Sequence, residues 1–455
     1  MIGWRIALAI SLHVLWGCDG RKVPEEHAGT MLPPAYWVWH RGSELNDAEV
    51  GVLHGTGIGK LYWQAAECRW EDGRWAFKRI AKPMAGAPGI RIVPVFRIEP
   101  QTAFLGTPDA AGRFAETIRR WLGEAAMPDE IQLDFDCPDR LMDRYARFLT
   151  DMGKEVAPAE ISITALASWP RHPDFRKLAA AVDSFAPMFY DLEEDKPSDV
   201  RAGRFQSLAD PAVKQHIARW SKCTKPWLAG LPNFERLSVF ANDGVLIGHV
   251  RDWRDDALFF HPQLKRRDVL PGTAVFDPLE VFDLSGTRVA PGMGVVHRTP
   301  DAVELGRLVE AARDAGAAGI IWFALPGPGM RSAFSVPHLT HPHAGLNLEL
   351  RVAGDGSVVL ENPGPADLPP GAWELRIRGG EPGSFRSASP GAFAELAQPD
   401  GLPAEMADSL VLRFARLPAG GSIVSGPLVT KNEGLVWRID GATQEKPVAS
   451  WKSAR

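Results

Sequence analysis

Two aspartates, Asp134 and Asp136, lie two residues apart in a short apolar segment. The segment 130–136 has the composition of a strand that is buried on both faces. Because alternate side chains of a strand point the same way, Gln132, Asp134 and Asp136 are predicted to share one face, about 6.6 Å apart per pair. Neighbouring buried carboxylates push their proton affinities apart, which is what acid/base chemistry needs. The alternative is a solvated pair at the surface end of a strand.

The segments around this pair predict how it is held in the fold. Strand-like and helix-like segments alternate along the middle of the chain, which indicates parallel α/β structure. Eight strands with intervening helices are typical of a (β/α)8 TIM barrel, and an open doubly wound sheet is the alternative. The predicted strands are 36–40, 60–65, 91–97, 131–136, 161–167, 184–190, 226–231 and 319–324.

The predicted domains follow from two departures from this alternation. The connection between the seventh and eighth strands is far longer than a βα unit and contains strand-like pieces, which predicts an insertion at about 237–298. The last part, 341–455, has short alternating strands separated by Gly, Pro and Asn turns. We therefore predict an α/β fold, a TIM barrel over 35–340 with an insertion after strand 7, followed by a C-terminal β-sandwich.

The N-terminal residues have the features of an export signal. Arg5 precedes an apolar stretch over 6–16 that is too short to span a bilayer. The stretch ends in Leu-Trp-Gly-Cys, which resembles the processing box of bacterial lipoproteins and implies lipidation of Cys18. We predict a signal peptide over 1–18, a linker over 19–34 and a lipid-anchored protein of the bacterial envelope, periplasmic or on the outer surface. The alternative is an ordinary cleaved signal peptide.

The amino-acid composition indicates which kinds of ligand the protein could bind. The 455 residues have a net charge of −5 with Lys and Arg scattered, so no nucleic-acid surface is indicated. Sixteen Trp against four Tyr supply flat apolar surfaces that suit sugar rings. Beyond Cys18, the three cysteines have none of the spacings of a metal or redox site, and we predict neither a metal nor a cofactor.

The C-terminal ends of barrel strands are where such folds place their chemistry. Carboxylates, one Arg, a phenol and several indoles are predicted there, a set that suits a polysaccharide or oligosaccharide. No Gly-rich phosphate loop, paired His ligands or nucleophile elbow competes with this interpretation. The predicted substrate-binding residues are Trp39, His40, Gln64, Arg97, Glu99, Gln132, Trp169, Asp191, Asn233 and Trp322.

Several strand ends resemble those of the family 18 glycoside hydrolases, the chitinase-like barrels. The segment 129–136 is similar in register to their fourth-strand signature, Asp-x-x-Asp-x-Asp-x-Glu. Met-Phe-Tyr-Asp at 188–191 resembles their sixth-strand Met-x-Tyr-Asp, and Gly-Leu-Pro at 230–232 resembles their seventh strand. Their eighth strand places a Trp at the floor of the pocket, which implies that position for Trp322.

This resemblance implies roles for three residues. Asp136 would protonate the glycosidic oxygen, Asp134 would orient the acetamido group that acts as nucleophile, and Tyr190 would donate to the acetamido carbonyl. The family has Glu where this chain has Asp136, which is shorter by one C–C bond of about 1.5 Å. Because a misplacement of about 1 Å can cost about 100-fold in rate, the identity of the acid stays open. The alternative acids are Glu67, Glu99 and Glu235.

A narrower resemblance covers most of the mature chain. Leu-Asp-Phe-Asp-Cys-Pro at 133–138, Ile-Thr-Ala-Leu at 163–166 and Tyr-Trp-Val-Trp at 36–39 resemble the bacterial family of the domain of unknown function 3142. That family implies a fold and no activity. We therefore predict a glycoside hydrolase-like envelope lipoprotein that acts on a polysaccharide. The alternative is a non-catalytic glycan-binding lipoprotein with a chitinase-like barrel.

Overall fold

The computed structural model describes residues 32–83, 86–379, 381, 383–398, 401–431, 434–441 and 452–454. Residues 32–455 form one folded unit. The predicted signal peptide (1–18), Cys18 and most of the predicted linker (19–34) lie outside the described residues. Within those described, no helix has the length and apolar character to cross a membrane.

Parallel strands close into a barrel, because β1 pairs with β16 on one side and with β2 on the other. This closure confirms the predicted TIM barrel and excludes the open doubly wound sheet. An additional strand, β3 (Arg74–Arg79), pairs antiparallel with the outer half of β2. The barrel strands are β1 (Pro34–Val38), β2 (Lys60–Glu71), β4 (Arg91–Ile98), β5 (Glu130–Asp134), β6 (Glu160–Leu166), β7 (Ser184–Met188), β8 (Leu228–Pro232) and β16 (Gly319–Phe323).

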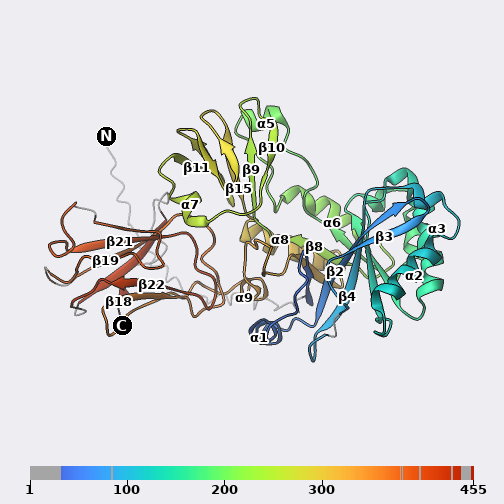
Figure 1. Cartoon of the computed structure of the whole chain (residues 1–455), viewed down its shortest axis with the longest axis horizontal. Helices are drawn as coiled ribbons and strands as arrows, with labels where there is room; N and C mark the ends of the chain where they lie inside the picture. Colours follow the sequence, from blue (N-terminus) through green and yellow to red (C-terminus); the bar gives the residue numbers. More distant parts are fainter. Residues whose placement is uncertain are drawn as a thin grey trace, which may run out of the picture. The chain divides into compact units, whose positions relative to one another are not determined.

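The helices that alternate with these strands pack on the outside of the barrel (Figure 1). Their apolar stripes form one core with the outward side chains of the strands, as Phe114 of α2 and Leu149 of α3 do with Leu133 of β5. The helices are α1 (Asp47–Gly55), α2 (Ala110–Leu122), α3 (Met142–Val156), α4 (Phe175–Ala180), α6 (Lys214–Trp220), α8 (Ala302–Asp314) and α9 (Val336–Thr340). The short α5 (Pro197–Arg201) instead packs against the insertion through Val200.

The insertion after the seventh barrel strand is an antiparallel sheet in the order β10-β9-β15-β12-β11, drawn in green to yellow in Figure 1. It has its own apolar core around Leu237, Val295 and Phe276. Its elements are β9 (Arg236–Phe240), β10 (Leu246–Val250), α7 (Asp255–Phe259), β11 (Leu264–Leu270), β12 (Thr273–Pro278), the hairpin β13 (Phe282–Leu284) and β14 (Thr287–Val289), and β15 (Gly294–Arg298).

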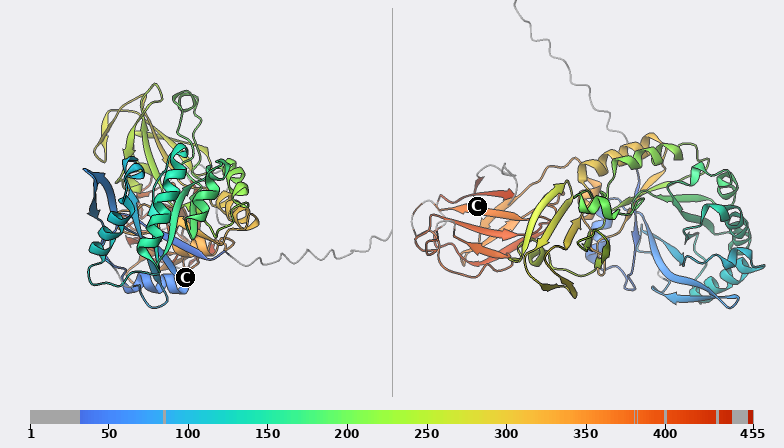
Figure 2. Two further views of the ribbon diagram at one scale, coloured as in Figure 1. Left: turned by 90° about the vertical axis from the view of Figure 1, so that its right-hand side faces the viewer. Right: turned by 90° about the horizontal axis from the view of Figure 1, so that it is seen from above.

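The C-terminal part is built from two antiparallel sheets, drawn in orange and red in Figure 2. Side chains from both sheets, such as Leu360 and Leu375, share one apolar core, as expected for the predicted sandwich. One sheet contains β17 (Glu349–Val352), β18 (Ser357–Glu361) and β22 (Ser422–Pro427), and the other contains β19 (Trp373–Arg378), β20 (Glu395–Ala397), β21 (Ser409–Phe414), β23 (Val436–Gly441) and β24 (Lys452–Ser453).

Candidate active site

A cavity of about 820 Å³ opens at the C-terminal ends of the barrel strands, and we call it the active-site cavity. This volume is typical of a ligand site. Asp134 and Phe323 are the last residues of β5 and β16, whereas Asp136 and Tyr190 lie two residues beyond their strands. The lining residues are Trp37, Trp39, His40, Arg97, Asp134, Asp136, Thr164, Leu166, Ala167, Ser168, Arg171, Met188, Tyr190, Asp191, Leu192, Glu193, His216 and Phe323.

Of the two acids, Asp134 is the one whose carboxyl is fixed by contacts with neighbouring side chains. The Thr164 hydroxyl donates to its Oδ1 at 2.8 Å, and Arg97 Nε lies 3.8 Å from its Oδ2. Its side chain is only 14% exposed, and burial raises the pKa of Asp134 from 3.8 to about 6. Thr164 and Arg97 oppose this shift, and the nearby charge of Asp136 adds to it. A carboxyl with this pKa exchanges its proton close to neutral pH.

Asp136 lies beyond the end of β5, which corrects the prediction that it shares a strand face with Gln132. The strand stops at Asp134, and the Cys137 N–H donates to the Phe135 carbonyl at 2.8 Å in a tight turn. The Asp136 side chain reaches solvent, yet the cavity walls remove part of its hydration and raise its pKa, an effect that Arg97 opposes. Across the described part of the chain, no hydrogen bond or ion pair holds its carboxylate.

Tyr190 faces the same cavity from the segment after β7. Its ring stacks on Phe323, with 5.6 Å between ring centroids, and packs edge-on against Phe234. Burial raises the pKa of the phenol well above its usual value, and the charges of Asp134 and Asp191 act in the same direction. The hydroxyl therefore keeps its proton at any physiological pH and can donate a hydrogen bond to a ligand.

Two indoles and Phe323 form an aromatic wall. Trp39 and Trp37 both meet Phe323 edge-on, at centroid distances of 5.7 and 6.1 Å. Trp37 Nε1 donates to Oε1 of Gln132 at 2.7 Å, and the Gln132 amide faces Ser162 at 3.4 Å. Gln132 was predicted to contact substrate, but it is fully buried and is not among the residues that line the cavity. Its contact with Trp37 shows that it fixes the wall instead.

The predicted positions of Trp322 and Trp169 also need correction. Trp322 points away from the barrel axis into the core under the helices, and its neighbour Phe323 lines the cavity instead. The cause is the alternation of side chains along β16, which puts consecutive residues on opposite faces. Trp169 is completely buried in the same outer core and does not reach the cavity.

Gln64 and Asn233 hold backbone in place rather than lining the cavity. Gln64 is buried, and its Oε1 accepts from the backbone N–H of His40 at 2.9 Å, where His40 has a φ of 53°. Asn233 is also buried and donates to the carbonyls of Ala324 and Phe334, each at 3.1 Å. The structure therefore does not bring these two amides, which were predicted to contact substrate, to the cavity, whereas His40 does line it.

Two of the alternative acids lie outside the lining. Glu99 pairs with Arg69 Nε at 2.7 Å, and Glu67 pairs with Lys78 Nζ at 2.9 Å. Neither carboxylate lines the cavity, so the structure does not bring Glu99, a predicted substrate contact, to it. Asp191 does line it, but both of its oxygens accept from Arg236 of β9. Asp191 is therefore held by an ion pair, whereas Asp134, Asp136 and the exposed Glu193 line the cavity with no ion pair closer than 3.8 Å among the described residues.

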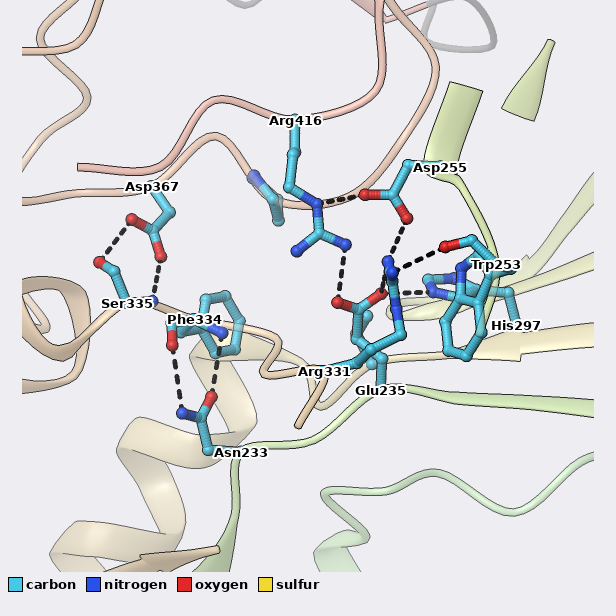
Figure 3. Close-up of polar contacts among 12 residues, drawn as sticks. Asn233, Glu235, Trp253, Asp255, His297, Arg331, Phe334, Ser335, Asp367 and Arg416 are labelled. Atoms are coloured by element: carbon cyan, nitrogen blue, oxygen red, sulfur yellow. Dashed lines mark hydrogen bonds and ion pairs between the residues drawn. The ribbon is translucent and has the colours of Figure 1, made fainter. Parts of the chain in front are cut away.

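The third alternative acid, Glu235, is buried in a charged network (Figure 3). Its oxygens face His297 Nε2 at 2.9 Å, Arg416 Nη2 at 2.7 Å and Arg331 at 3.6 Å. Burial opposes ionisation, but His297 and the two guanidinium groups outweigh it and lower the pKa of Glu235 to about 2. A carboxylate held ionised in this way cannot donate a proton near neutral pH.

Several cavity residues were not predicted from the sequence. Thr164 could have been found, because β6 pairs in register with β5 and places Thr164 beside Asp134. His216 comes from α6, and no motif marks it. No group of three His, Cys, Asp or Glu side chains suited to a metal ion occurs in the described part of the chain. The cavity residues absent from the predicted set are Trp37, Thr164, Leu166, Ala167, Ser168, Arg171, Met188, Leu192, Glu193, His216 and Phe323.

Replacing Asp134 with Asn is expected to stabilise the protein above pH 6. The folded-state pKa is raised, so the folded form loses stability as the pH rises from about 4 to about 6 and the buried group ionises. The shift corresponds to at most about 3 kcal/mol. Chemical unfolding at pH 8 and pH 4 should show a higher free energy of unfolding for Asp134→Asn than for the wild type at pH 8 only. The exposed Asp129→Asn, at the other end of β5, is the control, and equal stability of both variants at pH 8 would contradict this assignment.

Comparisons with known proteins give one family match and several structural similarities. No curated protein matches the chain. The Bacillus cereus spore cortex-lytic enzyme SleL is similar at 14% identity and a TM-score of 0.44, over 66% of this chain and 72% of SleL. A family 18 N-acetylglucosaminidase from Paenibacillus barengoltzii is similar at 12% identity and a TM-score of 0.41, over 64% of this chain and 95% of that enzyme.

The Paenibacillus chitinase ChiW is similar over 92% of this chain at 12% identity and a TM-score of 0.45, and the match covers only 55% of ChiW. The assignment of the barrel rests on the strand pairings described above rather than on these low similarities. The family match covers Asp134, Asp136 and Tyr190 of the barrel and extends into the first two strands of the insertion. Residues 88–247 match the model of the domain of unknown function DUF3142, as the motifs of the fourth and fifth barrel strands predicted.

Proposed function

We propose that this protein is a glycoside hydrolase that acts on a polysaccharide. The observation that supports it best is the convergence of Asp134, Asp136 and Tyr190 on one cavity with an aromatic wall. Both acids have a raised pKa, so one of them can hold a proton when a glycosidic oxygen arrives. The aromatic wall of Trp37, Trp39 and Phe323 gives the cavity an apolar side that suits the apolar faces of sugar rings.

In the proposed reaction, Asp136 gives its proton to the glycosidic oxygen as the bond from that oxygen to the anomeric carbon breaks. Asp134 and Tyr190 position the substrate. The Tyr190 phenol donates a hydrogen bond to it, and Asp134 donates one when it is protonated or accepts one when it is ionised. For an N-acetylated sugar, the acetamido oxygen bonds transiently to the anomeric carbon. Water then supplies a hydroxyl to that carbon and returns a proton to Asp136, which closes the cycle without a cofactor.

The test is the release of reducing ends from a panel of envelope and structural polysaccharides. We expect turnover of at least one glycan by the mature protein, with a loss of activity as the pH rises because Asp136 must be protonated to act as the acid; its raised pKa moves this loss to higher pH than an ordinary Asp would give. Heat-denatured protein is the control. Absence of turnover on every glycan, together with retained binding, would favour the second candidate.

The second candidate is a glycan-binding protein without turnover. It is favoured by one observation, that no hydrogen bond or ion pair among the described residues positions the Asp136 carboxylate. An acid must sit within hydrogen-bonding distance of the oxygen that it protonates. The cavity would then bind sugar through its aromatic wall and polar rim, and Asp136→Asn would leave the affinity for glycans unchanged.

We also propose that Cys18 is acylated and that the protein is anchored in the bacterial envelope. The support is the sequence around Cys18 alone. Replacing Cys18 with Ser is expected to move the protein from the membrane fraction to the soluble fraction, or to leave the precursor unprocessed. Fractionation and intact mass measure both outcomes, with Cys223→Ser as the matched thiol control. Normal processing and unchanged membrane association of Cys18→Ser would contradict the anchor.

A further inference from the structure

Arg416, which follows β21 of the C-terminal part, joins that part to the barrel and to the insertion. Its Nη2 donates to Oε1 of Glu235 at 2.7 Å, and its Nε donates to the carboxylate of Asp255 (Figure 3). Glu235 follows the barrel strand β8, and Asp255 is the first residue of α7 in the insertion. The residue before Arg416, Ala415, is buried in the apolar core of the insertion. Three parts of the chain therefore meet at one guanidinium group.

Glu235 belongs to residues 233–236, which we call the connecting segment because it leads from β8 to β9. Next to Glu235, the buried Phe234 ring packs edge-on against Tyr190 and Phe323, each with 5.9 Å between ring centroids. Tyr190 and Phe323 both line the active-site cavity. Edge-on aromatic contacts have a preferred geometry, so a displaced Phe234 displaces the rings that pack against it.

The other two residues of the connecting segment hold the same wall of the cavity. The backbone N–H of Asn233 donates to the Phe323 carbonyl. Arg236 donates to both carboxylate oxygens of Asp191, the residue after Tyr190. The connecting segment is therefore tied to the backbone on both sides of the stacked Tyr190 and Phe323 rings.

The position of Glu235 depends on the cations around it. Its side chain is fully buried, so the carboxylate has no access to water and must be held by ion pairs. Arg416 makes the shortest contact, at 2.7 Å, against 2.9 Å for His297 and 3.6 Å for Arg331. Loss of Arg416 leaves the carboxylate to His297 and Arg331 alone, and the adjoining Phe234 must move with it.

We propose that Arg416 is a positioning residue of the active site: by holding Glu235 it fixes Phe234, and through Phe234 the ring of Tyr190. The C-terminal part would then complete the catalytic cavity without lining it. This inference rests on the proposed function for its effect on catalysis, because Tyr190 is the donor that positions the substrate. The place of the Tyr190 ring can be measured without any substrate.

Fluorine NMR tests this role, because the chain has only four tyrosines. Labelling with meta-fluorotyrosine gives a small set of signals, and Tyr190→Phe identifies the one from Tyr190. Arg416→Met removes both ion contacts but leaves Glu235 with its two other cations, so the fold should persist. Arg416→Lys keeps a positive charge beside Glu235. Arg351→Met is the matched control, because Arg351 pairs with Glu361 at 3.0 Å on the surface of the C-terminal part.

We expect Arg416→Met to shift the Tyr190 signal and to leave those of Tyr62 and Tyr145 in place. On a hydrolysed glycan, kcat should fall by about tenfold with little change in KM, since a misplacement of about 1 Å can cost up to about 100-fold. Arg416→Lys should restore most of kcat, and Arg351→Met should match the wild type in both measurements.

Three results would overturn the positioning role: an unmoved Tyr190 signal, equal shifts of all the tyrosine signals, or a shifted Tyr190 signal with an unchanged kcat. A shifted Tyr190 signal in a protein that hydrolyses no glycan separates the two proposals. It supports the link from Arg416 to Tyr190 and removes the hydrolase.

Discussion

Replacing Asp136 with Asn is expected to lower kcat on a hydrolysed glycan by about 100-fold or more, with a much smaller change in KM. Proton donation by a positioned side chain contributes about 100-fold to 10,000-fold, and Asn cannot donate in this way. Asp136 is placed for this role because it lines the active-site cavity, and its pKa is raised by partial desolvation. The measurement is the initial rate of reducing-end release across a range of substrate concentrations.

The matched control is Asp139→Asn, three residues further along the chain, where the side chain is exposed and outside the cavity lining. It should retain wild-type kinetics. The pH profile gives a second readout, because Arg97 opposes the raised pKa of both acids. Arg97→Gln should therefore move the alkaline limb of the pH–rate profile to higher pH. An unchanged kcat in Asp136→Asn would remove it from the role of acid and leave Asp134 as the remaining candidate.

Replacing Glu235 with Gln is expected to destabilise the protein by about 3–5 kcal/mol at neutral pH, because it removes one partner of a buried ion network. Glu235 is fully buried at its side chain, and His297, Arg331 and Arg416 face its oxygens. Asp255 also accepts from both Arg331 and Arg416 (Figure 3), but it cannot replace the second negative charge. Denaturant unfolding followed by tryptophan fluorescence measures the loss.

The effect should depend on pH with a definite sign. The folded-state pKa of Glu235 is lowered from 4.5 to about 2, so its contribution is complete above pH 4.5 and disappears as the pH falls towards 2. The difference between wild type and Glu235→Gln should therefore shrink over that window. The control is Glu361→Gln, which breaks an exposed pair with Arg351 and should cost at most about 1 kcal/mol. A difference that is independent of pH would show that lost packing, not lost charge, causes the destabilisation.

The sequence by itself determined the barrel and the location of Asp134. Apolar runs of strand length alternate with amphipathic segments, and this local periodicity is set by residue type alone. Residue type also determined the position of Asp134 at the end of a buried strand. A carboxylate is rarely buried without a partner, so within an apolar segment it is expected where the strand ends. The insertion was recognisable because no βα connection needs so many residues.

Only the tertiary structure decided which side chains meet in the cavity. Trp322 and Phe323 are both apolar, so the sequence cannot tell which of them faces the barrel axis; the register of β16 against β1 and β8 does. Gln132 and Gln64 lie inside the barrel, but their hydrogen bonds to Trp37 and His40 join strands that are distant in the chain. Glu235 was a possible acid from its place after the seventh strand, but the folded chain surrounds it with His297, Arg331 and Arg416 from separate segments. The pKa of a carboxyl depends on burial and on neighbouring charges, and both exist only once the chain has folded.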